Sequence, residues 1–262
     1  MSGLSILQLN GLNALVTGGG SGIGRQIALG FAEAGANLIL VGRRLAPLED
    51  TAERAKKFGV CSIVINCDIT VEEDIKRIEQ NSGRVDILCN NAAAAPNAPW
   101  QTVSLAEWRS TFAINVDAMF RLCQIYAPKM MENRYGRIIN ISSVYGSMGG
   151  NPALYPGLDW DVASYFASKH AVHGITHYLA PRLAMHNVCI NTLSPGGFGA
   201  SDMNADSGMG TDEQLERFKS VCPMQRVGGH QDIAAAAVFL GSPGASYTTG
   251  HDLKVDGGWS IW

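Results

Sequence analysis

Short apolar runs alternate with longer helix-like segments along the whole chain. The runs are rich in Val, Ile and Leu and are nearly continuous in hydrophobicity, which is typical of strands buried on both faces. The seven runs are Asn13–Gly18, Asn37–Gly42, Ser62–Cys67, Val85–Asn90, Arg137–Ser142, Val188–Ser194 and Asp252–Gly257. The helix-like segments between them are Ile23–Ala34, Leu45–Phe58, Val71–Gln80, Leu105–Met131, Val162–His186 and Gln231–Leu240. This alternation predicts an α/β fold: a doubly wound, seven-stranded, mainly parallel sheet with helices on both faces.

One domain is expected over residues 1–262. The chain contains 262 residues, of which 46% are hydrophobic and 16% are charged, so it can bury a large core. It has no internal repeat and no Pro/Gly/Ser linker long enough to divide it. Two irregular stretches, near 146–161 and 195–221, each follow a predicted strand. Because ligands of open parallel sheets bind beyond the carboxyl ends of the strands, we expect both stretches to be substrate loops.

Composition excludes several classes of partner. A net charge of −3 without a basic stripe argues against nucleic acid and anionic lipid. No segment approaches the roughly 18 uninterrupted apolar residues of a membrane-spanning helix, and the N-terminus lacks the basic flank of a signal peptide. Six cysteines without a CxxC pair predict reduced thiols rather than disulfides or a zinc site. We therefore expect a cytoplasmic protein that acts on a small molecule.

A glycine-rich turn follows the first predicted strand and opens the first predicted helix. It reads Thr17-Gly18-Gly19-Gly20-Ser21-Gly22-Ile23-Gly24. Glycines in such a turn let the backbone approach a pyrophosphate closely, and the following helix offers free N–H groups and a partial positive charge to the anion. Glycine clusters alone are a weak signal because turn glycines are common. The position in the first strand–turn–helix unit nevertheless predicts a Rossmann-type dinucleotide site.

Further motifs follow in an order that resembles one known family over essentially the whole chain. The landmarks are the spacing Thr-Gly-x3-Gly-x-Gly, Asp68, Asn90-Asn91-Ala92, Asn115, Ser143, Tyr165 with Lys169, Pro195-Gly196 and the terminal Val255–Trp259. On the elements predicted above, they resemble the short-chain dehydrogenase/reductase family in its shorter, single-domain branch.

Tyr165 and Lys169 carry chemistry that the residue types themselves indicate. They stand at i and i+4 and therefore share one face of a helix. A free tyrosine has a pKa of about 10, which is high for proton exchange near neutral pH. An adjacent ammonium group stabilises the phenolate, so we expect Lys169 to lower the pKa of Tyr165 and make it a general acid and base. Alone, such a pair would more often be a solvated helix face.

The family resemblance implies roles for the other landmarks. Ser143, rather than Ser142, would hydrogen-bond the substrate oxygen that Tyr165 protonates or deprotonates, and Ser142 would cap the strand end. Lys169 would also hold the nicotinamide ribose, and Asn115 would hold a water that relays protons. Cofactor contacts are implied for Gly18, Ser21, Ile23, Gly24, Arg43, Arg44, Asp68, Ile69, Asn91, Ala92, Tyr165, Lys169, Pro195, Gly196 and Phe198.

The end of the second strand is expected to set the coenzyme. A carboxylate there would bind the ribose 2′-OH of NAD, but Gly42 stands at this position and Arg43 and Arg44 follow. Guanidinium groups suit a 2′-phosphate, so NADP(H) is favoured. NAD(H) remains the alternative if both arginines are solvated loop charges. Asp68 would meet the adenine amino group or, alternatively, serve as a helix N-cap.

The sequence departs from the family pattern at three places. Ala93 replaces a glycine, which is tolerated unless the position needs a positive φ. Near Ala200, with Ser201 adjacent, the family commonly has a threonine that contacts the nicotinamide. An insertion at Asn151–Asp161 brings polar and aromatic residues near the mouth of the site, where they could shape substrate choice or make a surface contact. These residues are Tyr155, Asp159, Trp160 and Asp161.

Three histidines, His170, His173 and His177, lie on the helix predicted around Tyr165. No carboxylate or cysteine completes a ligand set, and their spacing differs from HExxH. We therefore expect no metal site and interpret the three as exposed or interface histidines.

The combined motifs predict an oxidoreductase that transfers a hydride between NADP(H) and a secondary alcohol or ketone, with a sugar acid or polyol as substrate. The alternatives are a reductase of 3-oxoacyl thioesters or of cyclic ketones and steroids, and a catalytically idle nucleotide-binding regulator. Nucleotide-sugar epimerases and dehydratases resemble Thr-Gly-x2-Gly-x2-Gly instead and carry a larger C-terminal region. The resemblance also implies a homotetramer, in which Trp259 and Trp262 would be buried.

Overall fold

The computed structural model describes residues 5–151, 161–198 and 212–261, with the backbone alone for residues 212–215. Seven strands form one sheet in the order β3-β2-β1-β4-β5-β6-β7, and all six pairings are parallel. The strands are β1 (Asn13–Thr17), β2 (Asn37–Gly42), β3 (Ser62–Asn66), β4 (Ile87–Asn90), β5 (Gly136–Ile141), β6 (Val188–Pro195) and β7 (Asp252–Val255). The predicted Rossmann-type, doubly wound sheet is confirmed.

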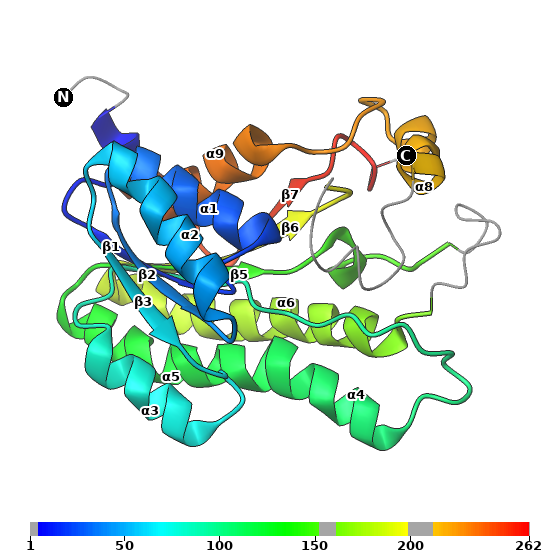
Figure 1. Ribbon diagram of the computed structural model, residues 1–262, viewed down its shortest axis with the longest axis horizontal. Helices are drawn as coiled ribbons and strands as arrows, with labels where there is room; N and C mark the ends of the chain where they lie inside the picture. The colour runs from blue at the N-terminus through cyan, green and yellow to red at the C-terminus, as the bar shows by residue number, and fades with distance from the viewer. Residues whose placement is uncertain (1–4, 152–160, 199–211, 262) are drawn as a thin grey trace.

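Helices cover both faces of this sheet (Figure 1). The α-helices are α1 (Gly22–Glu33), α2 (Leu45–Ala55), α3 (Glu72–Asn81), α4 (Leu105–Phe112), α5 (Ala118–Glu132), α6 (Ala163–Leu183), α8 (Asp212–Val221) and α9 (His230–Gly241). Short 3-10 turns are η1 (Ser5–Leu7), η2 (Lys56–Phe58), η4 (Val144–Gly146), η6 (Ala184–His186) and η7 (Pro243–Ala245). Helices α1, α2 and α9 lie on one face, and α3, α5 and α6 lie on the other.

Two apolar cores account for this layering. The first joins side chains of the sheet to Ile75 and Ile78 of α3 and to Leu122 of α5. On the opposite face, Ile27 of α1 and Ile233 of α9 belong to the second core. Every residue of β4, β5 and β6 is buried, which explains why apolar and polar residues do not alternate regularly along these strands.

The helical pattern predicted over Leu105–Met131 is interrupted in the structure. A π-helical turn, η3 (Ala113–Asp117), separates α4 from α5, and the N–H of Ala118 donates to the carbonyl of Ala113. Such turns insert a residue into a helix and often occur at functional sites. The stretch expected to be irregular over 195–221 also differs, because its last part forms α8.

The sheet topology places one edge for ligand binding. From β1 the chain winds outward through β2 and β3, and it then crosses back to β4 on the other side of β1. The strand order therefore reverses between β1 and β4, and ligands of such sheets bind beyond the strand ends at this point. Among the described residues, no helix has the length and apolar character needed to span a bilayer.

Candidate active site

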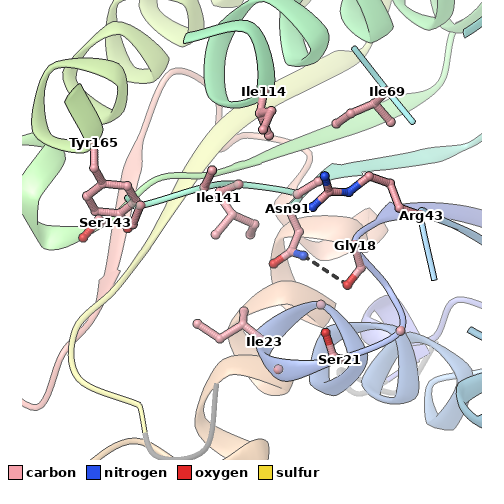
Figure 2. Close-up of a pocket in the computed structure, with 18 of the residues that line it drawn as sticks. Gly18, Ser21, Ile23, Arg43, Ile69, Asn91, Ile114, Ile141, Ser143 and Tyr165 are labelled. Atoms are coloured by element: carbon pink, nitrogen blue, oxygen red, sulfur yellow. Dashed lines mark hydrogen bonds between the residues drawn. The ribbon is translucent and has the colours of Figure 1, made fainter. Parts of the chain in front are cut away.

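A cavity of about 1130 Å³ lies beyond the carboxyl ends of the strands. The residues that the sequence assigned to the cofactor all line it, together with three of the four catalytic candidates. They are Gly18, Ser21, Ile23, Gly24, Arg43, Arg44, Asp68, Ile69, Asn91, Ala92, Ser143, Tyr165, Lys169, Pro195, Gly196 and Phe198. Figure 2 shows Ser143 and Tyr165 side by side at one end of the cavity, with Ser21 and Arg43 at the other. Asn115, the fourth catalytic candidate, lies behind the wall.

The glycine turn between β1 and α1 forms a cradle that a side chain would fill. A Cβ on Gly24 would lie 2.3 Å from the Gly18 carbonyl oxygen and 2.4 Å from Asn91 Nδ2. Gly18 itself has a φ of +67°, which favours glycine. Ser21, the N-cap of α1, makes no capping bond with its side chain, and the first turn of α1 contains no acidic residue. The N-terminus of this helix therefore suits a pyrophosphate.

Asn91 fixes this cradle against β4. Its Nδ2 donates to the carbonyl oxygens of Thr17 (2.9 Å) and Gly18 (3.5 Å), the second of which is drawn in Figure 2. The hydroxyl of Thr17 accepts hydrogen bonds from the N–H groups of Asn91 and Ala92, both at 3.0 Å. Sequence reasoning gave Thr17 no role of its own. Ala93, which replaces a family glycine, has no positive φ, so the alanine fits there without backbone strain.

The opposite end of the cavity combines two arginines with one carboxylate. Arg43 and Arg44 are exposed on the loop after β2, and Arg44 Nη2 donates to Ser21 Oγ at 3.1 Å. Asp68 accepts hydrogen bonds from the N–H and the hydroxyl of Thr70. The pKa of Asp68 is lowered mainly by the hydrogen bond from the Thr70 N–H, whereas burial raises it. The Thr70 hydroxyl and the charge of Arg43 lower it further. Because the N-cap of α3 is Val71, the helix-cap alternative for Asp68 is wrong.

Pro195 and Gly196 end β6 beside the cavity. The Gly196 N–H donates to the Val255 carbonyl at 2.9 Å, which continues the β6–β7 pairing. A Cβ on Gly196 would lie 2.7 Å from the Cβ of Asp256, so the close approach requires glycine here. Phe198 is buried and belongs to the second core. Ala200 and Ser201 lie outside the described residues.

Ser143 and Tyr165 can hold one oxygen atom of a ligand between two hydroxyl groups. Ser143 begins the turn η4 after β5, and its Oγ accepts a hydrogen bond from the N–H of Tyr145 at 3.2 Å. Tyr165 lies in the first turn of α6 and is hydrogen-bonded to Ser143. Burial raises the pKa of Tyr165, and the Ser143 hydrogen bond opposes this rise. Tyr165 is therefore protonated near neutral pH.

Lys169 occupies the next turn of α6 and is buried. Its Nζ donates to the carbonyl of Ile141 at 2.7 Å and lies 5.4 Å from the centre of the Tyr165 ring. Burial lowers the pKa of Lys169 to about 7. The expectation that its charge lowers the pKa of Tyr165 is wrong here, because burial of the phenol dominates. An ammonium has three N–H donors, so two remain for ribose hydroxyl groups.

Asn115 sits in the π-helical turn, and its amide group makes three hydrogen bonds within the protein. Its Oδ1 accepts a hydrogen bond from the N–H of Ala94 at 2.8 Å, and its Nδ2 donates to the Ala94 carbonyl and to Ser168 Oγ, both at 2.9 Å. Ser168 in turn donates to the carbonyl of Tyr165 at 2.7 Å. The side chain thus ties the loop after β4 to α6. Ser168 was not assigned a role from the sequence, although it directly precedes Lys169.

Asp161, the last residue of the inserted segment, contacts the loop after β4. The Asp161 carboxylate accepts a hydrogen bond from the Trp100 N–H at 2.7 Å, and its own N–H donates to Asn97 Oδ1 at 2.7 Å. Asp161 therefore anchors the loop after β4 rather than reaching toward a substrate. Tyr155, Asp159 and Trp160 lie outside the described residues.

Two further expectations need correction. His170 and His177 are exposed, but His173 is buried, with its Nε2 2.8 Å from Ser142 Oγ. The hydroxyl of Ser142 bonds to α6 instead of capping a strand end. In the part of the chain that the structure describes, no group of side chains could hold a metal ion.

Trp259 was expected to be buried between subunits. It is instead buried within the chain, where it contacts the rings of Tyr145 and Phe218. Trp262 lies outside the described residues.

The geometry fits a nicotinamide dinucleotide, and comparison with known proteins agrees. The family described as Enoyl-(Acyl carrier protein) reductase matches residues 18–260. The galactitol 2-dehydrogenase (L-tagatose-forming) of Cereibacter sphaeroides is 36% identical over 98% of both chains. Gluconate 5-dehydrogenase from Burkholderia cenocepacia, solved with NADP and tartrate, aligns over 99% of both chains with a TM-score of 0.87 and 28% identity.

A third similar protein was solved with the other coenzyme. This structure is 7α-hydroxysteroid dehydrogenase complexed with NADH and 7-oxo glycochenodeoxycholic acid, which aligns over 98% of both chains with a TM-score of 0.89 and 31% identity. The similar proteins are nicotinamide-dependent oxidoreductases of alcohols and ketones, so the idle-regulator alternative is not supported. The chain belongs to the short-chain dehydrogenase/reductase family and is an NAD(P)-dependent oxidoreductase acting on alcohol or ketone substrates.

Proposed function

We propose that the enzyme interconverts an uncharged polyhydroxylated alcohol and its ketone with NADP(H), using Ser143, Tyr165, Lys169 and Asn115. The coenzyme, when bound, accepts or supplies the hydride. Ser143 Oγ and Tyr165 Oη hold the substrate oxygen from two sides. During ketone reduction, Tyr165 donates its proton to this oxygen, and during alcohol oxidation the phenolate removes the hydroxyl proton. The Ser143 hydrogen bond stabilises the charge that develops on the oxygen.

Lys169 contributes to the site through its ammonium group, which lies next to Tyr165. Its Nζ is held at the Ile141 carbonyl and keeps two donors for the ribose hydroxyl groups of the coenzyme. Asn115 maintains the adjoining wall, because its amide group joins Ala94 to Ser168. The π-helical turn around Asn115 is the position from which a water relaying protons to Lys169 would be held.

The coenzyme preference rests on the loop after β2. Gly42 offers no carboxylate to the ribose 2′-OH, whereas Arg43 and Arg44 both line the cavity at this end. Two guanidinium groups suit the doubly charged 2′-phosphate of NADP. Asp68, which Thr70 holds through two hydrogen bonds, would accept a hydrogen bond from the adenine amino group.

The positions of the positive charges in the cavity support an uncharged substrate over a negatively charged one. Of the 20 lysines and arginines, those that line the cavity are Arg43, Arg44 and Lys169. The arginines lie at the coenzyme's adenosine end, and Lys169 is held by Ile141. The two internal segments outside the described residues, 152–160 and 199–211, contain no lysine or arginine.

A carboxylate or phosphate on the substrate would therefore lose its hydration without gaining a cationic partner near Tyr165, at a substantial cost in free energy. This argues against sugar acids and carrier-bound acyl thioesters and for an uncharged polyol. The similar galactitol 2-dehydrogenase is named for a substrate of this class.

Turnover of an alcohol panel tests the proposal. The panel contains galactitol and other hexitols, gluconate, a hydroxyacyl thioester and a cyclic alcohol, each with NADP and with NAD. We expect the hexitols to be oxidised fastest and Tyr165→Phe to lower kcat by about 10²–10⁴-fold, as loss of a general acid–base does. Tyr247→Phe is the matched control, because Tyr247 is an exposed tyrosine that does not line the cavity. Faster oxidation of gluconate would refute the charge argument, and unchanged kcat in Tyr165→Phe would refute the catalytic assignment.

We also propose a homotetramer in a reducing, cytoplasmic compartment. Large apolar side chains are exposed on α5 (Phe120), α6 (Tyr178) and η6 (Met185), where helices of a second copy could cover them. All six cysteines are unpaired, including the exposed Cys61. A mass of one chain in light scattering would overturn the tetramer.

A further inference from the structure

A buried hydrogen-bonded contact behind the catalytic residues joins β5 to α6. Ser142 lies between the end of β5 and Ser143, and its Oγ donates to the carbonyl of Lys169 at 3.2 Å. The same Oγ lies 2.8 Å from Nε2 of His173, which is one helical turn beyond Lys169. Ser142 has no exposed surface of note, and His173 is 9% exposed.

The direction of each hydrogen bond follows from the number of protons. A serine hydroxyl has one hydrogen, and the hydroxyl of Ser142 gives it to Lys169. With that hydrogen directed to the Lys169 carbonyl, we assign Nε2 of His173 as the donor to Ser142 Oγ. Burial lowers the pKa of His173, which keeps the imidazole neutral near pH 7.

The charged and titratable groups around His173 come from α6 and β7. Asp252 on β7 raises its pKa, whereas His177, His170 and Lys254 lower it. Asp252 Oδ1 lies 3.9 Å from Nε2 and accepts hydrogen bonds from the hydroxyl groups of Thr192 and Ser194. At this distance Asp252 does not replace Ser142 as the partner of His173.

The turn that carries Ser143 packs directly on this contact. A Cβ on Gly146, the last residue of η4, would lie 2.4 Å from Ser142 Oγ, 2.7 Å from His173 Nε2 and 2.8 Å from the Lys169 carbonyl oxygen. No side chain could occupy this space without displacing one of the three atoms. The position of η4, and with it that of Ser143, therefore depends on where His173 and Ser142 lie.

Three successive residues at the end of β5 consequently bond to three successive turns of one face of α6. Ile141 accepts from Lys169, Ser142 bonds to His173, and Ser143 bonds to Tyr165. Residues at i, i+4 and i+8 of a helix share a face, so these bonds fix both the height and the rotation of α6 against the strand.

We propose that His173 is a positioning residue for hydride transfer: by donating to Ser142 it holds Ser143 and the Lys169 backbone at the separation that the substrate oxygen requires. The inference rests on the roles proposed above for Ser143 and Tyr165. Misplacement of reacting groups by a fraction of an ångström to 1 Å lowers kcat strongly, even when the change lies outside the site.

The test compares variants of His173 and Ser142 in the intact enzyme. His173→Leu removes the donor, and His173→Gln restores a neutral N–H donor of similar reach. His177→Leu is the matched control, because His177 is an exposed histidine one turn further along α6. The readouts are kcat and KM for the alcohol substrate, together with the thermal midpoint.

We expect His173→Leu to lower kcat about tenfold with KM changed less than about twofold, and His173→Gln to stay within about threefold of the wild type. Because His173 acts through Ser142, Ser142→Ala should lower kcat similarly, and the double variant should be no slower than Ser142→Ala alone. If His173→Leu does not fold, kcat of Ser142→Ala is compared with kcat of Ser142→Thr, since threonine keeps the hydroxyl group and should keep kcat closer to the wild type.

Two results would overturn the inference. One is an unchanged kcat in His173→Leu, with or without a lower thermal midpoint, since that would make the residue merely structural. The other is a double variant in which the two losses multiply, because the residues would then act independently. Full activity of Tyr165→Phe in the same assay would instead refute the proposed catalytic roles, and the two failures are thereby distinguished.

Discussion

Replacing either of the two arginines after β2 should lower kcat/KM for NADP more than kcat/KM for NAD. Arg43 and Arg44 are exposed at the adenosine end of the cavity, and they are the charged groups proposed to bind the 2′-phosphate. A hydrogen bond to a charged group contributes about 1.5–3 kcal/mol, and exposure to water places these bonds at the lower end. A loss of about 1.5 kcal/mol corresponds to about a tenfold fall in kcat/KM.

The two arginines should not behave alike, because their contacts within the protein differ. Arg43→Ala should lower kcat/KM with NADP about tenfold and leave that with NAD within about twofold. Arg44→Ala should lower the NADP value equally, and it should also lower the NAD value by about twofold to threefold, since Arg44 donates to Ser21 in the pyrophosphate-binding turn.

Initial rates of coenzyme reduction at saturating alcohol measure these four values directly. Arg54→Ala is the matched control, because Arg54 is an exposed arginine of α2 that pairs with Asp50 and does not line the cavity. Equal losses with NADP and NAD in Arg43→Ala would refute the reasoning. A wild-type enzyme that prefers NAD would refute it as well, because both guanidinium groups would then be solvated loop charges.

Two further predictions concern stability. Asn115→Ala removes one buried and two partly buried hydrogen bonds, so urea unfolding should show a loss of about 1–3 kcal/mol; a loss below about 0.5 kcal/mol would contradict the role given to its amide. Arg226 and the Gly229 N–H lower the pKa of Asp232 from 3.8 to about 2. Because the carboxyl pKa is lower in the folded state, the ionised Asp232 stabilises the fold above about pH 4, and this stabilisation is lost as the pH falls through the folded-state value. The unfolding free energy of the wild type should therefore exceed that of Asp232→Asn by about 1 kcal/mol near neutral pH, after discounting for solvent screening, and this difference should disappear between about pH 4 and pH 2. A gap that stays constant over this range would contradict the assignment.

The strands could be predicted because burial on both faces leaves a direct trace in the sequence. β5 and β6 are buried at every residue, and their Ile, Leu and Val residues do not alternate strictly with polar ones, although both strands also contain buried polar residues such as Arg137, Asn140 and Asn191. The edge strands β3 and β7 are half-exposed, but their Val, Ile and Leu content still marked them. Since parallel strands need crossover helices, the alternation then fixed the layers of the fold.

The π-helical turn could not be predicted in the same way. The apolar pattern continues through Ala113–Asp117, so periodicity indicates one uninterrupted helix. What accompanies the extra residue is a set of contacts that Asn115 makes with Ala94 and Ser168, 21 and 53 residues away in the chain. Local sequence carries no information about partners at such distances.

Electrostatic expectations failed for a related reason. The sequence shows that Lys169 is a neighbour of Tyr165, and a neighbouring cation alone would lower the pKa of the phenol. It does not show that Lys169 is buried and Tyr165 half-buried, and this desolvation raises the pKa of Tyr165 and lowers that of Lys169 to about 7. His173 was interpreted as exposed for the same reason, since its partner Ser142 lies 31 residues earlier.

The shifted pKa values of Tyr165 and Lys169 also predict how the rates of ketone reduction and alcohol oxidation depend on pH. Because the pKa of Tyr165 is raised, the phenol is protonated near neutral pH and can donate to a ketone oxygen at once. Alcohol oxidation requires the phenolate instead, so its rate should rise with pH. A cation close to the phenol would reduce the difference, but Lys169 directs one of its N–H groups to Ile141 and loses its charge above about pH 7. We therefore expect ketone reduction to be fastest near neutral pH and the rate of alcohol oxidation to rise in more alkaline solution.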